Sequence, residues 1–422
     1  MQVCHKLYIT NSQLGLSLNE TTYFRKPDHA GLSQAVHDKF SIRPIPIYPN
    51  LIVATLFLSY SIEPHSRSLF AYIMTKILVV FGATGQQGAS VVNCVLGDPD
   101  LSAKYRIRAA TRDPSKPAAQ ALSSKGIEVI QADADNPESL KPVMHGASTT
   151  FIMTTPTFGG EKLEVSEIAR GKAMADAAVA AGLEYIIFSS LPASIKISSG
   201  KYRGIAHFDA KAEVEEYIRG LPIKSTIYTP GWFMQNFTRH MGPQLMDDGT
   251  YAILNIVSPR IGLPLIDIVA DTGKFIGPIL AEPEKFEGKV LSAASGLYTY
   301  GEIVQVMSKT SGKTVEYKQV TDNPFRNMPP ARADMLLSMM PYLEECGYYG
   351  PQTKELVEAT VKNAKGKLTT LEEYLAREPL ALWYSMWIVS SRQWQAYLVA
   401  WLPLSDHLKH APSHSSTRTE LE

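Results

Sequence analysis

Lys76-Ile-Leu-Val-Val-Phe-Gly-Ala-Thr-Gly-Gln-Gln-Gly88 joins a short aliphatic run to three glycines in the spacing Gly-x-x-Gly-x-x-Gly. The run is typical of a buried strand, and residues 89–96 can continue as a helix. In such a unit the first glycine permits a sharp turn, the second lets a ligand approach the backbone, and the third lets the helix pack close to the strand. The helix N-terminus adds unpaired N–H groups, which favour a phosphate. The stretch therefore predicts a dinucleotide-binding unit, with a tight turn that holds no ligand as the alternative.

Length and composition limit the class of protein. The chain has 422 residues, enough for two ordinary domains or for one large domain with extensions. A formal net charge of zero argues against a nucleic acid or an acidic membrane as a direct partner. The three cysteines lie far apart, which argues against a disulfide framework or a metal site and fits a reducing compartment. We expect the protein to be located in the cytoplasm, or in both the cytoplasm and the nucleus.

Strands and helices alternate after residue 76. Further strands are expected at 105–111, 126–131, 147–153, 184–189 and 223–228, with a long helix at 162–181. This alternation predicts an α/β fold, a Rossmann-type doubly wound parallel sheet that occupies residues 74–230. In such sheets the ligand lies beyond the carboxyl ends of the strands.

The alternation of strands and helices becomes less regular after Pro230. Short strands are expected at 251–257, 288–293 and 315–320, and helices at 267–281, 299–310, 356–364 and 371–377. The last helix has Thr369 or Thr370 as its N-cap. We interpret residues 231–379 as a smaller α+β lobe on the substrate side that partly returns to the sheet.

Both ends of the chain differ from the middle. Residues 1–73 have no clear period, which predicts a poorly ordered N-terminal extension or a start-site artefact. Residues 380–422 form a C-terminal extension that contains four of the five tryptophans, and an interfacial helix at a membrane surface is the alternative there. Arg392 and Gln393 argue against a transmembrane span.

The end of the second strand predicts which dinucleotide binds. An NAD site usually has an acidic residue there, whereas this chain has Arg112, with Lys116 one turn further on. A guanidinium pairs well with a 2′-phosphate, so we expect NADP(H). Asp113 keeps NAD as the alternative, or caps the following helix.

The ends of the third and fourth strands offer further contacts. Asp133 is placed to meet the adenine amino group, or else it forms an ordinary turn. Thr154, Thr155 and Pro156 are expected to line the cofactor beyond the fourth strand.

The catalytic pair of short-chain reductases, Tyr-x-x-x-Lys on a helix, is absent at the expected helix, since Tyr202 is followed four residues later by Ala206. His207 and Lys211 have the same spacing, which places both side chains on one helix face. Histidine can donate a proton near neutral pH, so we predict His207 and Lys211 as the catalytic pair. The alternatives are a His207 without a chemical role and a Lys211 that only binds ribose.

At these motifs the chain resembles the NmrA-like family, an atypical branch of the short-chain dehydrogenase/reductase superfamily. The resemblance runs from Met74 to Arg377 and rests on residues 82–88, 111–113, 207–217 and 230–237. It implies a Rossmann-type domain and NADP(H) as the cofactor. The cofactor contacts that it implies are Gly82, Ala83, Thr84, Gly85, Gln86, Gln87, Gly88, Arg112, Lys116, Lys211, Trp232, Phe233, Gln235 and Asn236.

The resemblance implies two functions, because some members of the family reduce small molecules and others sense NADP(H) and regulate a protein partner. As an enzyme, the chain would reduce a small apolar carbonyl or activated alkene, with residues 191–205 as a mobile lid and residues 232–234 as an apolar wall. As a sensor, it would use the same cofactor site without turnover and bind a partner such as a transcription factor.

Overall fold

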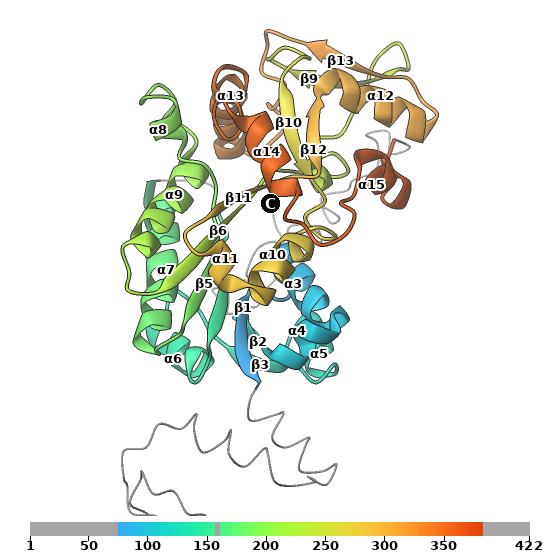
Figure 1. The fold of residues 1–422 in the computed structure, drawn as a ribbon. Coiled ribbons are helices and arrows are strands. Elements are labelled where there is room, and N and C mark those ends of the chain that lie inside the picture. The colour runs from blue at the N-terminus through green and yellow to red at the C-terminus, as the bar shows by residue number, and fades with distance from the viewer. Residues whose placement is uncertain (1–74, 157–160, 383–422) are drawn as a thin grey trace, which may run out of the picture. The chain divides into compact units, whose positions relative to one another are not determined.

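The computed structural model describes residues 75–156 and 161–382 (Figure 1). In it the glycine stretch forms the strand, turn and helix that the sequence predicts. Strand β1 (Lys76–Phe81) leads into Gly82, whose φ of 67° lies in the left-handed region that glycine readily adopts. Helix α3 (Gln86–Gly97) follows. A Cβ on Gly88 would lie 2.2 Å from the carbonyl oxygen of Gly82, so only glycine lets the helix pack this close to the strand.

Seven parallel strands form the main sheet in the order β11-β6-β5-β4-β1-β2-β3 (Figure 1). The chain adds strands on one side of β1 and then crosses to the other side, so the switch point lies between β1 and β4. The strand β11 lies within residues 231–379 of the chain and pairs in parallel with β6 at one edge of this sheet. The strands are β2 (Tyr105–Thr111), β3 (Glu128–Gln131), β4 (Thr149–Met153), β5 (Tyr185–Ser189), β6 (Lys224–Pro230) and β11 (Val290–Ala293).

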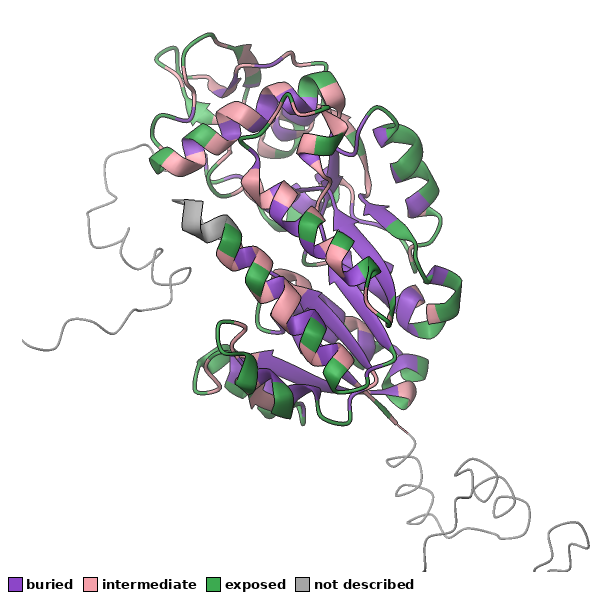
Figure 2. Ribbon diagram, turned by 90° about the vertical axis from the view of Figure 1, so that its left-hand side faces the viewer, coloured by how far each residue is buried: buried purple, intermediate pink, exposed green. Residues whose placement is uncertain are grey.

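Helices cover both faces of this sheet, and the strands between them are largely buried (Figure 2). Leu78 and Val80 of β1 belong to one apolar core, and Val79 and Phe81 belong to the other. This alternation follows from the period of two residues in a strand. The first face carries α3, α4 (Pro99–Lys104), α5 (Pro117–Ser123), α10 (Thr272–Ala281) and α11 (Pro283–Phe286), and the second carries α6 (Leu140–Met144), α7 (Glu161–Ala180) and α9 (Ala206–Arg219).

The second lobe has a core of its own, built on two three-stranded sheets with the orders β12-β10-β7 and β13-β9-β8. Its sheets contain β7 (Trp232–Phe233), β8 (Gln244–Leu245), β9 (Tyr251–Asn255), β10 (Gly262–Ile266), β12 (Gly296–Thr299) and β13 (Val315–Gln319). Its helices are α12 (Tyr300–Ser311), α13 (Pro330–Cys346), α14 (Thr353–Val361) and α15 (Leu371–Arg377). Thr370 is the N-cap of α15 and forms a capping box with Glu373.

Some elements of this lobe differ from the prediction. The helix expected from residue 267 begins only at Thr272, because the Asp267 carboxylate accepts bonds from the backbone N–H groups of Val269 and Ala270 and holds a turn there. The helix α13 was not predicted, and it contains Pro341, a residue that ordinarily ends a helix.

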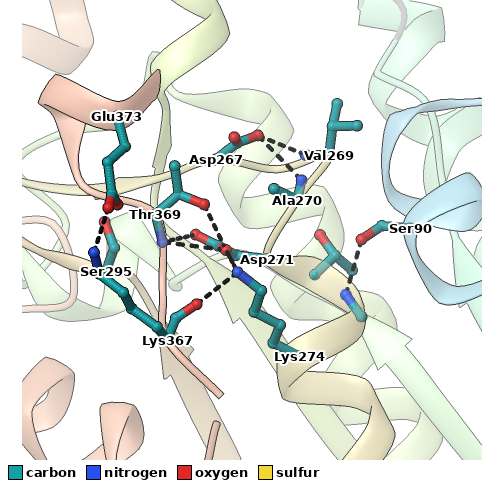
Figure 3. A network of polar contacts seen from close by, with 12 residues as sticks. Ser90, Asp267, Val269, Ala270, Asp271, Lys274, Ser295, Lys367, Thr369 and Glu373 are labelled. Atoms are coloured by element: carbon teal, nitrogen blue, oxygen red, sulfur yellow. Dashed lines mark hydrogen bonds and ion pairs between the residues drawn. The ribbon is translucent and has the colours of Figure 1, made fainter. Parts of the chain in front are cut away.

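Asp271, a buried aspartate just before α10, lies in a polar network that connects α10 to α3 and to the segment before α15 (Figure 3). Asp271 accepts hydrogen bonds from the backbone N–H of Thr369 at 3.1 Å and from the Lys274 ammonium at 2.7 Å. Burial raises the pKa of Asp271, and the bonds from Lys274 and Thr369 oppose that rise. Two residues later, the backbone N–H of Gly273 donates to Ser90 of α3 at 2.9 Å. The network therefore holds α10 against both α3 and the segment that precedes α15.

The predicted extension at residues 1–73 lies outside the described residues, and so does the C-terminal extension from residue 383 onward. In the described part of the chain, no helix combines the length and apolar character that crossing a membrane requires. The same part contains no group of three or more His, Cys, Asp or Glu side chains that could hold a metal ion.

Candidate functional site

The carboxyl ends of β1, β4 and β5 meet at the glycine turn. A Cβ on Gly82 would lie 2.6 Å from the sulfur of Met153, the last residue of β4. The hydroxyl of Ser189, the last residue of β5, donates to the Gln87 side chain at 2.7 Å. Ser189 was not singled out from the sequence, although its place at the end of the fifth strand was a usable signal.

The N-terminus of α3 fits a phosphate group. Its N-cap is Gly85, no side chain caps it, and its first turn holds no acidic residue. A Cβ on Gly85 would have one neighbour within 4 Å, the carbonyl oxygen of Gly82 at 3.3 Å. Backbone N–H groups at such a terminus attract an anion, and the bare glycine leaves room for it. The glycine stretch thus has the geometry of an anion cradle.

Two cations lie exposed beyond β2. Within residues 75–156 and 161–382, no side-chain hydrogen bond or ion pair is formed by Arg112 or Lys116. The carboxylate of Asp113 instead accepts bonds from the backbone N–H of Ser115 at 2.9 Å and from its hydroxyl at 2.5 Å. These two bonds lower the pKa of Asp113. The acid that would bind a ribose in an NAD site is therefore committed to a local turn.

Asp133 also takes part in a turn. Its carboxylate accepts from the backbone N–H of Asp135 at 3.1 Å, and its own backbone N–H donates to the Ser139 hydroxyl at 2.8 Å. Asp135 in turn pairs with Arg170 of α7 at 2.7 Å. This arrangement corresponds to the turn-forming alternative, and a contact of Asp133 with adenine stays a prediction.

The structure brings Lys211 and Thr154 together at the end of β4. The Lys211 ammonium donates to the Thr154 carbonyl oxygen at 2.7 Å, to the Thr154 hydroxyl at 2.5 Å and to Glu167 at 2.6 Å. The Thr154 hydroxyl donates to the same Glu167 oxygen at 2.7 Å. Burial lowers the pKa of Lys211, and Glu167 opposes that effect. Thr155 is exposed and Pro156 is partly buried at the rim.

His207 lies one turn before Lys211 on α9, and its Nδ1 atom is buried although part of the residue is accessible. Burial lowers the pKa of His207 to about 3, and the positive charges of Lys211 and Arg332 contribute to the same shift. The imidazole is therefore neutral near pH 7. That state argues against His207 as the proton donor at neutral pH, because the charged imidazolium is the stronger acid.

The segment after β6, which is predicted to form an apolar wall, is largely buried. Trp232 is 5% exposed, and its indole N–H has no acceptor among the described residues. Gln235 is buried too, but its amide nitrogen donates to Asp267 at 2.8 Å and its amide oxygen accepts from the backbone N–H of Ile268 at 3.4 Å. Gln235 therefore supports the network of Asp267. Phe233 and Asn236 are partly buried.

The predicted lid is held at two places. It contains a short helix, α8 (Ser194–Ile197), where the Ser194 hydroxyl donates to Asp209 of α9 at 2.5 Å. Further along, the Tyr202 hydroxyl donates to Glu345 of α13 at 2.7 Å. A lid that opens here would have to break both contacts.

Two hollows lie in the second lobe, with volumes of about 510 Å³ and about 380 Å³. Both are lined by the segment that contains Gln319, Thr321 and Asn323. None of their lining residues belongs to the predicted cofactor or catalytic set.

Solved structures with the same fold bind nicotinamide dinucleotides. A crystal structure of NmrA, a negative transcriptional regulator, in complex with NADP is 25% identical, has a TM-score of 0.60, and is matched over 73% of this chain and 96% of that chain. A complex of NmrA with NAD is also 25% identical, with a TM-score of 0.61 over the same shares of the two chains. The NADPH-dependent quinone oxidoreductase QOR2 of Escherichia coli, in complex with NADPH, is 23% identical over 71% of this chain and 99% of its own, with a TM-score of 0.58, which shows the fold alone.

The chain is also similar in sequence to proteins that are described as NmrA-like. An NmrA-like family domain-containing protein of Dictyostelium discoideum is 29% identical over 72% of this chain and 98% of its own. The NmrA-like family domain-containing oxidoreductase FrzB of a Cladobotryum species is 31% identical over 58% of this chain and 77% of its own. The model of the NmrA-like family matches residues 74–375. The chain therefore belongs to the NmrA-like family.

Proposed function

We propose that this chain is an NADP(H)-dependent oxidoreductase that reduces a small apolar carbonyl compound or activated alkene. The observation that carries the proposal is the buried lysine Lys211 of α9. Its ammonium lies at the carboxyl end of β4, on the same edge of the sheet as the anion cradle of α3. NADP-bound NmrA and relatives that are described as oxidoreductases support it.

The residues that would hold the cofactor fit its parts. The pyrophosphate would lie at the N-terminus of α3, where Gly85 leaves the backbone accessible. Arg112 and Lys116 would pair with the 2′-phosphate. NADPH would supply a hydride at its nicotinamide ring. Lys211 would hold the nicotinamide ribose and assist proton transfer, and the buried indole N–H of Trp232 would find an acceptor on a ligand.

Arg112→Ala should weaken NADPH binding about 10-fold to 100-fold, since one charge-assisted hydrogen bond contributes about 1.5–3 kcal/mol. NADH affinity should change little, because NADH lacks the 2′-phosphate. Calorimetry with both dinucleotides measures these changes, and Lys125→Ala is the matched control, since Lys125 is an exposed cation before β3 at the opposite edge of the sheet. If NADH binds to the wild type as tightly as NADPH, the preference for NADP(H) is wrong.

The wild type should consume NADPH in the presence of a quinone, an aldehyde or an enone, and Lys211→Ala should lose most of this turnover. A spectrophotometric assay of NADPH oxidation against a panel of these compounds measures it, with circular dichroism to verify that the variant folds. Turnover that survives in folded Lys211→Ala would exclude Lys211 from the reaction.

A second candidate is an NADP(H) sensor that regulates a protein partner without turnover. It is favoured by the three bonds that already occupy the Lys211 ammonium, and by the likeness to NmrA, described as a negative transcriptional regulator. Tight NADPH binding without consumption against the whole panel, together with a partner that copurifies, would decide for the sensor.

A further inference from the structure

Glu167 is a buried acid in the second turn of α7 that faces the end of β4. Its side chain is 3% exposed, and that of its ion-pair partner Lys211 is 8% exposed. One carboxylate oxygen, Oε1, accepts from both the Lys211 ammonium at 2.6 Å and the Thr154 hydroxyl at 2.7 Å. The three residues come from α7, α9 and the end of β4, so the contacts close a ring between three elements.

The bonds of this ring fix the Lys211 ammonium in one place. An ammonium has three N–H donors. Here they go to the Thr154 carbonyl oxygen, the Thr154 hydroxyl and Glu167. A new partner for Lys211, such as a ribose hydroxyl, therefore has to replace one of these three acceptors.

Glu167 supplies the negative charge that a buried ammonium needs. An ammonium that is buried without a counter-ion costs several kcal/mol or loses its proton. On its own helix Lys211 faces His207, which is neutral near pH 7, and β4 offers it two uncharged oxygens of Thr154. One turn after Glu167 on α7, Arg170 pairs with Asp135.

We propose that Glu167 is a positioning residue of the site, which keeps Lys211 charged and holds it at the carboxyl end of β4. This inference rests on the proposed function, in which Lys211 contacts the cofactor. Glu167 itself does not need to touch the cofactor or the substrate.

The test is the pH dependence of NADPH affinity, measured by calorimetry between about pH 6 and pH 10. Glu167 raises the pKa of Lys211, so Glu167→Gln should lower it further. A cofactor contact that needs charged Lys211 is present below this pKa and is lost as the pH rises through it. We therefore expect Glu167→Gln to lose affinity at a pH lower by at least about one unit than the wild type, and Glu167→Asp to restore most of the difference.

Glu213→Gln is the matched control, because Glu213 pairs with Lys172 at 2.7 Å between the same two helices but on their exposed side. Its pH profile should equal that of the wild type. A Glu167→Gln profile that equals the wild type, or that lies lower by the same factor at every pH, would overturn the inference while leaving the proposed function intact. If Glu167→Gln does not fold, Glu167→Asp decides, with a smaller shift in the same direction expected. A wild type that binds no NADPH would overturn the proposed function and this inference with it.

Discussion

Gly88→Val should abolish stable folding of the sheet with its glycine turn, and NADPH binding with it. A Cβ at this position would lie 2.2 Å from the carbonyl oxygen of Gly82, 2.4 Å from its carbonyl carbon and 2.7 Å from the backbone nitrogen of Ala83. All three are backbone atoms, so no side chain can rotate away, and α3 would have to move off β1. We expect a loss of more than about 3 kcal/mol in the free energy of unfolding.

Gly97→Ala is the control for this change, because Gly97 is the last residue of the same helix and a Cβ there would have no neighbour within 4 Å. It should leave stability unchanged or raise it by less than about 1 kcal/mol. Denaturant unfolding of both variants and calorimetry with NADPH measure these effects. A Gly88→Val variant with the midpoint of the wild type would contradict the close approach of helix and strand.

This local contact also shows why part of the fold was readable from the sequence. The spacing of Gly82, Gly85 and Gly88 follows from neighbouring atoms in one turn, so a short stretch contains all the information. The strand 105–111 and the helix 371–377 were predicted with the bounds that the structure gives, since each has a clear local pattern. By contrast, β10 pairs with β12 and β7, and such pairing between distant segments leaves no local pattern in either strand.

Some residues of the candidate site were likewise predicted from the sequence, and others were not. Lys211 and Thr154 were predicted separately from a helix motif and a strand end, and the structure joins them by two hydrogen bonds. Glu167 was missed because a single acid within a long helix that contains several charged residues looks like part of a solvated face. Gln235 was predicted as a cofactor contact from a motif, but a motif does not show that Asp267, more than 30 positions later in the chain, bonds its amide.

Lys211→Met should cost about 3–5 kcal/mol of folding free energy, as expected when one partner of a buried ion pair is removed. The change leaves the Glu167 carboxylate buried with the Thr154 hydroxyl as its remaining donor among these three residues. Lys172→Met, in the exposed pair with Glu213 between the same helices, should cost less than about 1 kcal/mol. Denaturant unfolding of the protein without cofactor measures both. If both variants lose the same folding free energy, burial does not make the pair of Lys211 and Glu167 more important for stability than the exposed pair.

Replacing both Lys211 and Glu167 separates the contribution of the pair to folding stability from its contribution to NADPH binding. The double variant Lys211→Met with Glu167→Leu fills the same space with apolar groups, so it should recover most of the loss of Lys211→Met, reduced by about 1 kcal/mol for the polar partners that the Thr154 hydroxyl loses. A double variant that folds well but binds NADPH weakly would mean that the charged pair contributes little to the fold and is needed for the site. A double variant as unstable as Lys211→Met would instead make the ring of Lys211, Thr154 and Glu167 a structural link between α7, α9 and β4.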